Sequence, residues 1–308
     1  MNIARISRLT SSTLNITFNS IRSYSSAEER LSCYNINEAV KVSESGERIL
    51  HVEINRPKTR NAINTDVFNG LTHVFGKLND DRHYRVAILS SVGDFFCSGI
   101  DLKTFQSFVP THTEDVGRKA LALRSVINML QDSFKKVSVC QKPVISVVSG
   151  GCIGAGLELI SLADIRYVTK DSYFTIREVE LGLAADLGAL QFLPLIMSNQ
   201  SVLRELTYTG RKISADEALN LNLVGKVLSD KDEAISSAIE LATTIASKSP
   251  IVVQGAKVGL DYSRDHGVWE GLQFMVHWNM AMLQSEDLIK SAMALMSKSP
   301  EPPKFDDL

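Results

Sequence analysis

Apolar positions along the chain alternate between the two-residue period of a strand and the three- to four-residue period of a helix. By residue number, strands are predicted at 40–42, 49–54, 86–90, 95–97, 144–148 and 224–228. Helices are predicted at 67–78, 102–108, 116–136, 157–163, 190–196, 201–209, 215–221, 233–246 and over most of 250–296. Residues 110–115 are predicted to form a loop. This interleaving of strands and helices is typical of an α/β fold.

Two helical stretches carry apolar stripes. The long helix at 116–136 is expected to turn this face inward: Leu121, Leu123, Val126, Ile127, Leu130 and Phe134. The C-terminal helices are rich in Met and aromatic residues, and five of their side chains are expected to be exposed unless something covers them: Val276, Met280, Leu283, Leu288 and Met293. Such a stripe indicates an oligomer interface or intrachain core, and the pattern leaves both open.

The stretch from Ser149 to Arg166 is the segment around which the chain is organised. The predicted strand 144–148 leads into a turn with four glycines, Gly150, Gly151, Gly154 and Gly156, and then into a short helix. Glycines let the backbone approach a ligand closely, and the N-terminus of a helix presents free N–H groups that favour negative charge. Tight packing between strand and helix explains the same glycines, so the turn alone assigns no function.

Three carboxylates lie in and after this turn. Glu158 lies in the first turn of the predicted helix, Glu178 on a predicted strand, and Asp186 in a loop. N–H donors that hold an oxyanion, beside carboxylates that move protons, are the groups that enolate chemistry requires. The residues around Asp186 are apolar, so desolvation is expected to raise the pKa values of these carboxylates. A single acid of this kind would more simply be a solvated loop charge or a helix cap.

Two motifs together resemble the enoyl-CoA hydratase/isomerase (crotonase) superfamily: Gly150-Gly-Cys-Ile-Gly-Ala-Gly-Leu-Glu158 and Phe96-Cys-Ser-Gly-Ile-Asp101. The run Glu178-Val-Glu-Leu-Gly-Leu-Ala-Ala-Asp186 resembles, more narrowly, the mitochondrial and peroxisomal Δ3,5-Δ2,4-dienoyl-CoA isomerases. The similarity extends roughly from His51 to Lys290. It implies a crotonase (ClpP-like) fold, which is a spiral of ββα units with a C-terminal helical oligomerisation region, assembled as a homotrimer or homohexamer.

The resemblance also implies a reaction, the isomerisation of 3,5-dienoyl-CoA to 2,4-dienoyl-CoA in fatty acid β-oxidation. The backbone N–H groups of Ile100 and Ala155 are expected to hold the thioester enolate oxygen, although relatives usually carry Gly where this chain has Ala155. Glu178 is expected at C2 and Asp186 at C6, because one carboxylate does not easily reach two carbons four bonds apart. Glu158 is expected to support them.

Glu158 keeps a second reaction open. A 2-enoyl-CoA hydratase uses two glutamates, one for water at C3 and one for a proton at C2, and Glu158 and Glu178 stand at those positions. The dienoyl isomerases carry Asp where this chain has Glu158. Asp186 favours the isomerase, because hydratases usually carry Gly at that place. The presence of all three acids disfavours a non-catalytic relative that binds acyl-CoA or RNA.

Recognition of coenzyme A is implied along the loop of residues 56–62 and the turn of residues 98–102. The expected substrate-binding residues are Arg60, Ala62, Ser98, Gly99, Ile100, Asp101, Leu102 and Gly154. Asp101 also fits a structural role in a turn or helix cap. Coenzyme A enters as part of the substrate, and no other cofactor is expected.

Composition disfavours several other classes of protein. A net charge of -2 over 308 residues gives no electrostatic basis for binding nucleic acid. No apolar run approaches the roughly 20 residues of a membrane-spanning helix. The 4 cysteines lack a CxxC spacing and the 6 histidines lack an HxxxH pair, so neither a disulfide framework nor a metal site is expected.

The N-terminus differs from the remainder of the chain. Residues 1–27 are basic and rich in Ser and Thr, and no Asp or Glu occurs before Glu28. This is typical of a mitochondrial transit peptide, although a tail without a targeting role has the same composition. The last three residues, Asp306-Asp-Leu308, are not the peroxisomal Ser-Lys-Leu signal. We therefore predict a transit peptide at 1–27, a crotonase core at 28–240, a trimerisation region at 241–308 and a location in the mitochondrial matrix.

Overall fold

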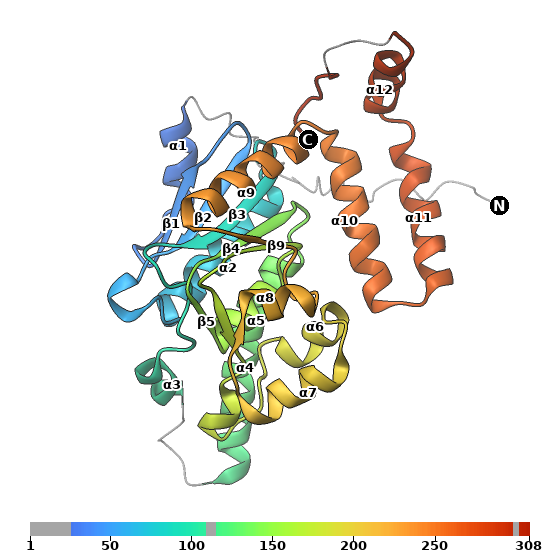
Figure 1. The fold of residues 1–308 in the computed structure, drawn as a ribbon. Coiled ribbons are helices and arrows are strands. Elements are labelled where there is room, and N and C mark those ends of the chain that lie inside the picture. The colour runs from blue at the N-terminus through green and yellow to red at the C-terminus, as the bar shows by residue number, and fades with distance from the viewer. Residues whose placement is uncertain (1–25, 109–114, 298–301) are drawn as a thin grey trace, which may run out of the picture.

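Two sheets form the centre of the fold in the computed structural model, which describes residues 26–108, 115–297 and 302–308 (Figure 1). The strands are β1 (Val40–Glu44), β2 (Ile49–Ile54), β3 (Val86–Ser91), β4 (Val144–Val148), β5 (Gly151–Ile153), β6 (Ile165–Thr169), β7 (Tyr173–Thr175), β8 (Ile213–Ser214) and β9 (Lys226–Leu228). The larger sheet has the order β1-β2-β3-β4-β6-β9, and its neighbours are parallel except β1 and β2. The smaller sheet has the order β5-β7-β8.

Helices surround both sheets. The first half of the chain contributes α1 (Ala27–Ser32), η1 (Pro57–Thr59), α2 (Thr65–Asp80), α3 (Leu102–Phe108), α4 (Val116–Ser138) and α5 (Ala155–Ser161). The second half contributes η2 (Glu178–Leu181), α6 (Ala189–Ile196), α7 (Gln200–Thr209), α8 (Ala215–Asn220), α9 (Lys231–Ala246), α10 (Pro250–Asp265), α11 (Val268–Met282) and α12 (Glu286–Ser297). Here η denotes a 3₁₀ helix.

The larger sheet is buried on both faces, which explains why its parallel strands are nearly continuous apolar runs. In β3, Ala87 and Leu89 belong to the core that includes α2 and α4, whereas Val86 and Ile88 belong to the core that includes α9. Successive side chains of a strand point to opposite faces, so one strand serves both cores. Helix α9 presents a row of small side chains to the sheet, Ala234, Ala238, Ala242 and Ala246, and therefore lies close to it.

The spacing of apolar residues predicted most helices and strands correctly, but three predicted details were wrong. Phe95 to Cys97 form a loop in which Cys97 makes an isolated bridge to Cys152, not a strand. Glu178 begins the 3₁₀ helix η2 and does not lie on a strand. On α4, Leu121 is 65% exposed and does not belong to the inner face. Of the loop predicted at 110–115, residues 110–114 lie outside the described residues, and Asp115 caps α4.

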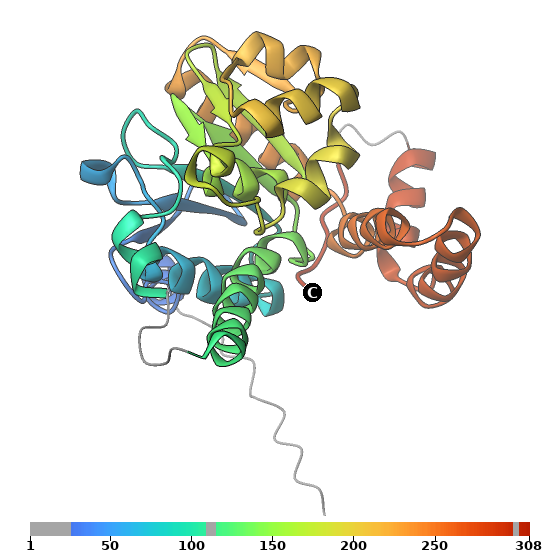
Figure 2. The same ribbon diagram turned by 90° about the horizontal axis from the view of Figure 1, so that it is seen from below.

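The C-terminal helices α10 to α12 project to one side of the sheet-containing body in both views (Figures 1 and 2, orange to red). An ion pair of 2.7 Å between Lys257 Nζ and Asp164 Oδ2 connects α10 to the body. The apolar stripe predicted on these helices is exposed in the chain and is not intrachain core: Val276, Met280, Leu283, Leu288 and Met293. The boundary expected at residue 240 falls inside α9, which continues through it. The predicted transit peptide lies, up to residue 25, outside the described residues.

Candidate active site

A cavity of about 720 Å³ opens between α3, α4, the glycine-rich turn and the loop after η2. This volume is typical of a small-molecule site. Nine of the predicted site residues line it: Ser98, Gly99, Ile100, Leu102, Gly154, Ala155, Glu158, Glu178 and Asp186. The fold therefore brings two motifs and two acidic segments, separated by up to about ninety positions in the sequence, to one place.

Two backbone N–H groups at the wall of this cavity have no acceptor built into their local structure. Gly99 O and Asp101 N both bond to Ile63, so the N–H of Ile100 between them points away from that partner. Ala155 is the first residue of α5, where an N–H has no intrahelical acceptor. Both residues line the cavity. The pair is thus suited to hold an oxyanion.

Ala155 fits this position without backbone strain. Among the described residues, positive φ values outside glycine occur at Arg48, Arg60, Asn61 and Asn222. The preceding residue, Gly154, has the unusual backbone, with φ 52° and ψ −119°. A Cβ on Gly154 would lie 2.8 Å from Glu178 Oε1. Glycine at 154 therefore provides both the turn into α5 and the space for the Glu178 carboxylate.

The three carboxylates lie in surroundings that disfavour negative charge. Burial raises the pKa of Glu158 from its ordinary value of 4.5 to about 8, and the charge of Glu178 adds to the rise. Burial likewise raises the pKa of Glu178, with a contribution from the charge of Asp186. Burial also raises the pKa of Asp186, which is only half-buried. The predicted direction is confirmed, and carboxyl groups of raised pKa can exchange protons near neutral pH.

The loop that carries Asp186 is held by two side chains. Glu158 Oε1 accepts hydrogen bonds from the backbone N–H of Leu187 at 2.9 Å and of Ala189 at 3.3 Å. Gln131 Nε2, on α4, donates to the backbone carbonyl of Asp186 at 2.6 Å. Sequence reasoning missed Gln131, because a polar residue on the outer side of a predicted helix gives no signal.

The sequence model described as Enoyl-CoA hydratase/isomerase matches residues 44–302. This chain belongs to the enoyl-CoA hydratase/isomerase family. The mitochondrial Delta(3,5)-Delta(2,4)-dienoyl-CoA isomerase of Mus musculus is 46% identical to it over 273 residues, which are 88% of this chain and 83% of that protein. The peroxisomal protein of the same activity name from Arabidopsis thaliana is 39% identical over 262 residues, which are 84% of this chain and 93% of that protein.

Solved structures place the chain in the fold of this family. An enoyl-CoA hydratase from Mycobacterium tuberculosis H37Rv aligns with a TM-score of 0.75 at 30% identity over 88% of this chain and 99% of its own. One from Bacillus anthracis aligns with a TM-score of 0.78 at 26% identity, over 87% and 98%. The crotonase fold expected from the two motifs is thereby confirmed.

Three of the predicted substrate-binding residues, Arg60, Ala62 and Asp101, do not line the 720 Å³ cavity. The Arg60 guanidinium lies over the ring of Phe95, 5.7 Å from its centroid, and Ala62 is buried. Asp101 accepts from both Nη atoms of Arg56 at 3.1 Å, and its other oxygen accepts from the first turn of α3. Asp101 therefore has the structural role that its sequence context also fitted.

Asn61, which follows Arg60, organises this loop and was not singled out from the sequence. Its side chain accepts from Arg56 N at 2.7 Å and donates to the carbonyls of Val92 and Phe95 at 2.9 and 2.7 Å. Ser98 N donates to Arg60 O at 3.0 Å. The loop of residues 56–62 is thus fixed against the turn that carries Ile100.

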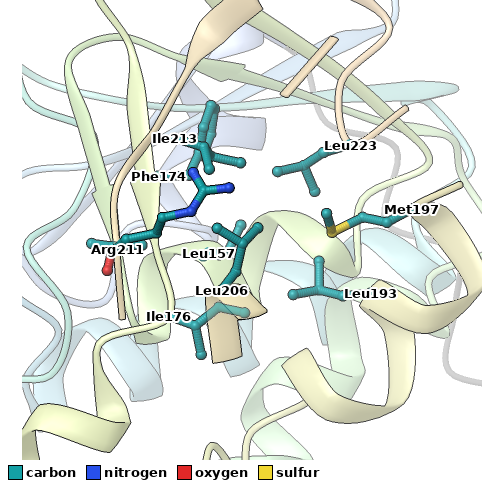
Figure 3. Close-up of a pocket in the computed structure, with 10 residues that line it drawn as sticks. Leu157, Phe174, Ile176, Leu193, Met197, Leu206, Arg211, Ile213 and Leu223 are labelled. Carbon is teal, nitrogen blue, oxygen red and sulfur yellow. The ribbon is translucent and has the colours of Figure 1, made fainter. Parts of the chain in front are cut away.

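Two further hollows lie near the site. An apolar gap of about 10 Å³, lined by residues such as Leu157, Leu193 and Met197, holds no more than about one water molecule and admits no substrate (Figure 3). A cavity of about 550 Å³ beside α6 and α7 shares Glu178, Leu183 and Ala184 with the site, so it adjoins the site.

Within residues 26–108, 115–297 and 302–308, no group of three or more His, Cys, Asp or Glu residues is arranged to hold a metal ion. In the same part of the chain, no helix is both long and apolar enough to cross a membrane.

Proposed function

We propose that this chain converts 3,5-dienoyl-CoA to 2,4-dienoyl-CoA in the β-oxidation of unsaturated fatty acids. The observation that carries the proposal is that Glu178 and Asp186 line one cavity together with the N–H donors of Ile100 and Ala155. Relatives that are 44 to 47% identical over 83 to 88% of this chain carry the name of this activity.

The reaction begins with the thioester oxygen bound to the N–H groups of Ile100 and Ala155. Glu178 removes a proton from C2, and the electron pair delocalises onto the adjacent thioester oxygen and, in the other direction, through the two double bonds to C6. Each donor contributes about 3 kcal/mol to the stability of this dienolate, by comparison with other oxyanion sites. Protonated Asp186 then gives its proton to C6, which leaves double bonds at C2 and C4.

The cycle ends with Glu178 protonated and Asp186 ionised, so one proton must return from the first group to the second. The raised pKa values of both groups make this exchange possible near neutral pH. Glu178 Oε2 is buried and has no hydrogen-bond partner within the described residues. An oxygen in this state is free to take the C2 proton.

The acyl chain has an apolar wall to lie against beyond C6. Helices α3 and α4 supply it: Phe105, Phe108, Leu123, Val126, Ile127 and Leu130. We place coenzyme A at the loop of residues 56–62 and the turn of residues 98–102, where Arg60 and Ser98 lie. No cofactor other than the coenzyme A of the substrate takes part.

Hydration of 2-enoyl-CoA is the less supported alternative. It would require Glu158 to activate water together with Glu178. In the structure Glu158 Oε1 already accepts two backbone hydrogen bonds, and Glu158 is 2% exposed. A relative named probable enoyl-CoA hydratase 2 is 29% identical to this chain, whereas three mammalian relatives named as dienoyl-CoA isomerases are 44 to 47% identical.

The assembly and the location complete the proposal. The exposed stripe on α11 and α12 supports assembly of the chain into a homotrimer or homohexamer through residues 241–308. The mitochondrial relatives support a mitochondrial location, and we place the enzyme in the matrix after removal of residues 1 to about 27.

A two-substrate assay tests the function. The chain without residues 1–26 is offered a 3,5-dienoyl-CoA and, separately, a 2-trans-enoyl-CoA, and absorbance is followed. We expect rapid growth of the conjugated 2,4-dienoyl absorbance and slow hydration. Rapid hydration without dienoyl conversion would show that Glu158 and Glu178 act as a hydratase pair.

A further inference from the structure

The loop of residues 183–189, defined here to include Ala189 as the first residue of α6, follows η2 and carries Asp186 at its centre. Two side chains hold it at that residue and at positions that follow it. Gln131 on α4 donates to the carbonyl of Asp186 itself, at 2.6 Å, and Glu158 on α5 accepts from Leu187 and Ala189, at 2.9 and 3.3 Å. The two side chains come from different helices. Gln131 lies 55 positions along the sequence from the group it bonds, and Glu158 lies 29 and 31 positions from its two donors.

Glu158 replaces a missing helix cap. The N-cap residue of α6 is Gly188, which has no side chain to accept the first N–H groups of the helix. The carboxylate of Glu158 accepts one of them, from Ala189, and also accepts the N–H of Leu187. Burial of an acid beside Glu178 and Asp186 is costly unless hydrogen bonds offset it, and Glu158 accepts two. This contact gives Glu158 a structural role that requires an acceptor oxygen.

We propose that Gln131 and Glu158 are positioning residues that hold the loop of residues 183–189 so that Asp186 faces C6 of the acyl chain. The inference rests on the proposed dienoyl isomerisation and adds that Glu158 is not a proton carrier in it. Glu158 and Gln131 act on the C6 end of the reaction, whereas Glu178 acts at C2 from the separate element η2.

The expected consequence is selective loss of the second proton transfer. A displacement of about 1 Å of a catalytic group costs on the order of 100-fold in rate. Release of the loop displaces Asp186 and leaves Glu178 beside Gly154. The C2 proton should therefore still exchange with solvent while formation of the 2,4-diene becomes slow. A general loss of structure would slow both steps together.

Two matched pairs of variants separate the roles. Gln131→Met keeps the length of the side chain and removes the donor, whereas Gln131→Lys keeps a donor. Glu158→Leu removes the acceptor, whereas Glu158→Gln keeps an acceptor oxygen and has no acidic proton to transfer. Each variant is incubated with 3,5-dienoyl-CoA in D2O, and deuterium at C2 of the recovered substrate is compared with product formed.

For Gln131→Met and Glu158→Leu, we expect product formation to fall about 10- to 100-fold while exchange at C2 persists. For Gln131→Lys and Glu158→Gln, we expect rates close to that of the parent protein. The proposal is overturned if Glu158→Gln is as inactive as Glu158→Leu, because Glu158 would then carry a proton. It is also overturned if exchange and product formation fall in parallel.

Amide hydrogen exchange tests, without any substrate, whether Glu158 holds the loop of residues 183–189. The N–H groups of Leu187 and Ala189 should exchange faster in Glu158→Leu than in the parent protein or in Glu158→Gln. Unchanged amide exchange in Glu158→Leu would show that Glu158 does not hold this loop. If the parent protein does not convert dienoyl-CoA, the proposed function fails, and this measurement still decides whether Glu158 holds the loop.

Discussion

A single methyl group added at Gly154 should lower the stability of the fold slightly and the catalytic rate strongly. An alanine Cβ there would lie 2.8 Å from Glu178 Oε1, well inside van der Waals contact, so the carboxylate has to move. The backbone at φ 52° and ψ −119° is also one that residues other than glycine rarely adopt. Strain of this kind costs about 1–3 kcal/mol.

Both costs can be measured. For a domain of this size, 1–3 kcal/mol corresponds to a fall in Tm of about 2–5 °C. Displacement of Glu178 by several tenths of an ångström should lower kcat/KM of Gly154→Ala about 10- to 100-fold for 3,5-dienoyl-CoA. Exchange of the C2 proton should fall with it, because Glu178 acts at C2. Differential scanning calorimetry and the dienoyl absorbance assay provide the two readouts.

Gly182→Ala is the matched control. Gly182 also has a positive φ, of 74°, but no atom lies within 4 Å of an added Cβ. This variant should lose about 1 kcal/mol of stability from the left-handed backbone and keep its kcat/KM. The reasoning is refuted if Gly154→Ala retains full activity, or if both variants lose activity equally.

Three other perturbations follow from the structure. Because the pKa of Glu158 is raised from 4.5 to about 8 in the folded protein, its contribution to stability is complete below about pH 4.5 and is lost as the pH rises through about 8. The Tm of Glu158→Gln relative to the parent protein should therefore increase from about pH 5 to about pH 8.5. Met280→Glu with Leu283→Lys should dissociate the oligomer in light scattering, whereas Lys136→Glu on α4 should not; a parent protein that is already monomeric would contradict the interface. Ile127→Trp should fill the acyl wall and raise KM more for long than for short dienoyl chains, and equal KM changes would place the chain elsewhere.

The parts of the fold that the sequence predicted are those with a sustained period. Strands β2 to β4 and helices α2, α4 and α9 each bury a regular set of side chains, and this regularity is visible in the sequence. Strands β5, β7 and β8 have 2 or 3 residues each, too few for a period to be recognised. Phe96 and Cys97 were mistaken for a strand because a buried loop requires apolar residues as much as a strand does.

The candidate site was predictable wherever a motif carries a chemical requirement. Ile100, Ala155, Glu158, Glu178 and Asp186 could be grouped because a glycine-rich turn, a second turn and three acids together fit enolate chemistry. What holds them in place could not be predicted. Neither the bond from Gln131 to the Asp186 backbone nor the packing of Glu178 against a bare Gly154 has a local pattern, because each depends on segments that meet only in the folded chain.

The assignment of one carboxylate to each end of the diene is the central claim, and deuterium placement tests it most directly. Glu178→Gln and Asp186→Asn are incubated with 3,5-dienoyl-CoA in D2O, and NMR locates the deuterium. We predict that Asp186→Asn forms product at least 100-fold more slowly yet exchanges the C2 proton, in keeping with the usual size of a lost acid–base step. Glu178→Gln should lose both activities. Nearly normal product formation by Asp186→Asn, with deuterium at C6, would contradict the account.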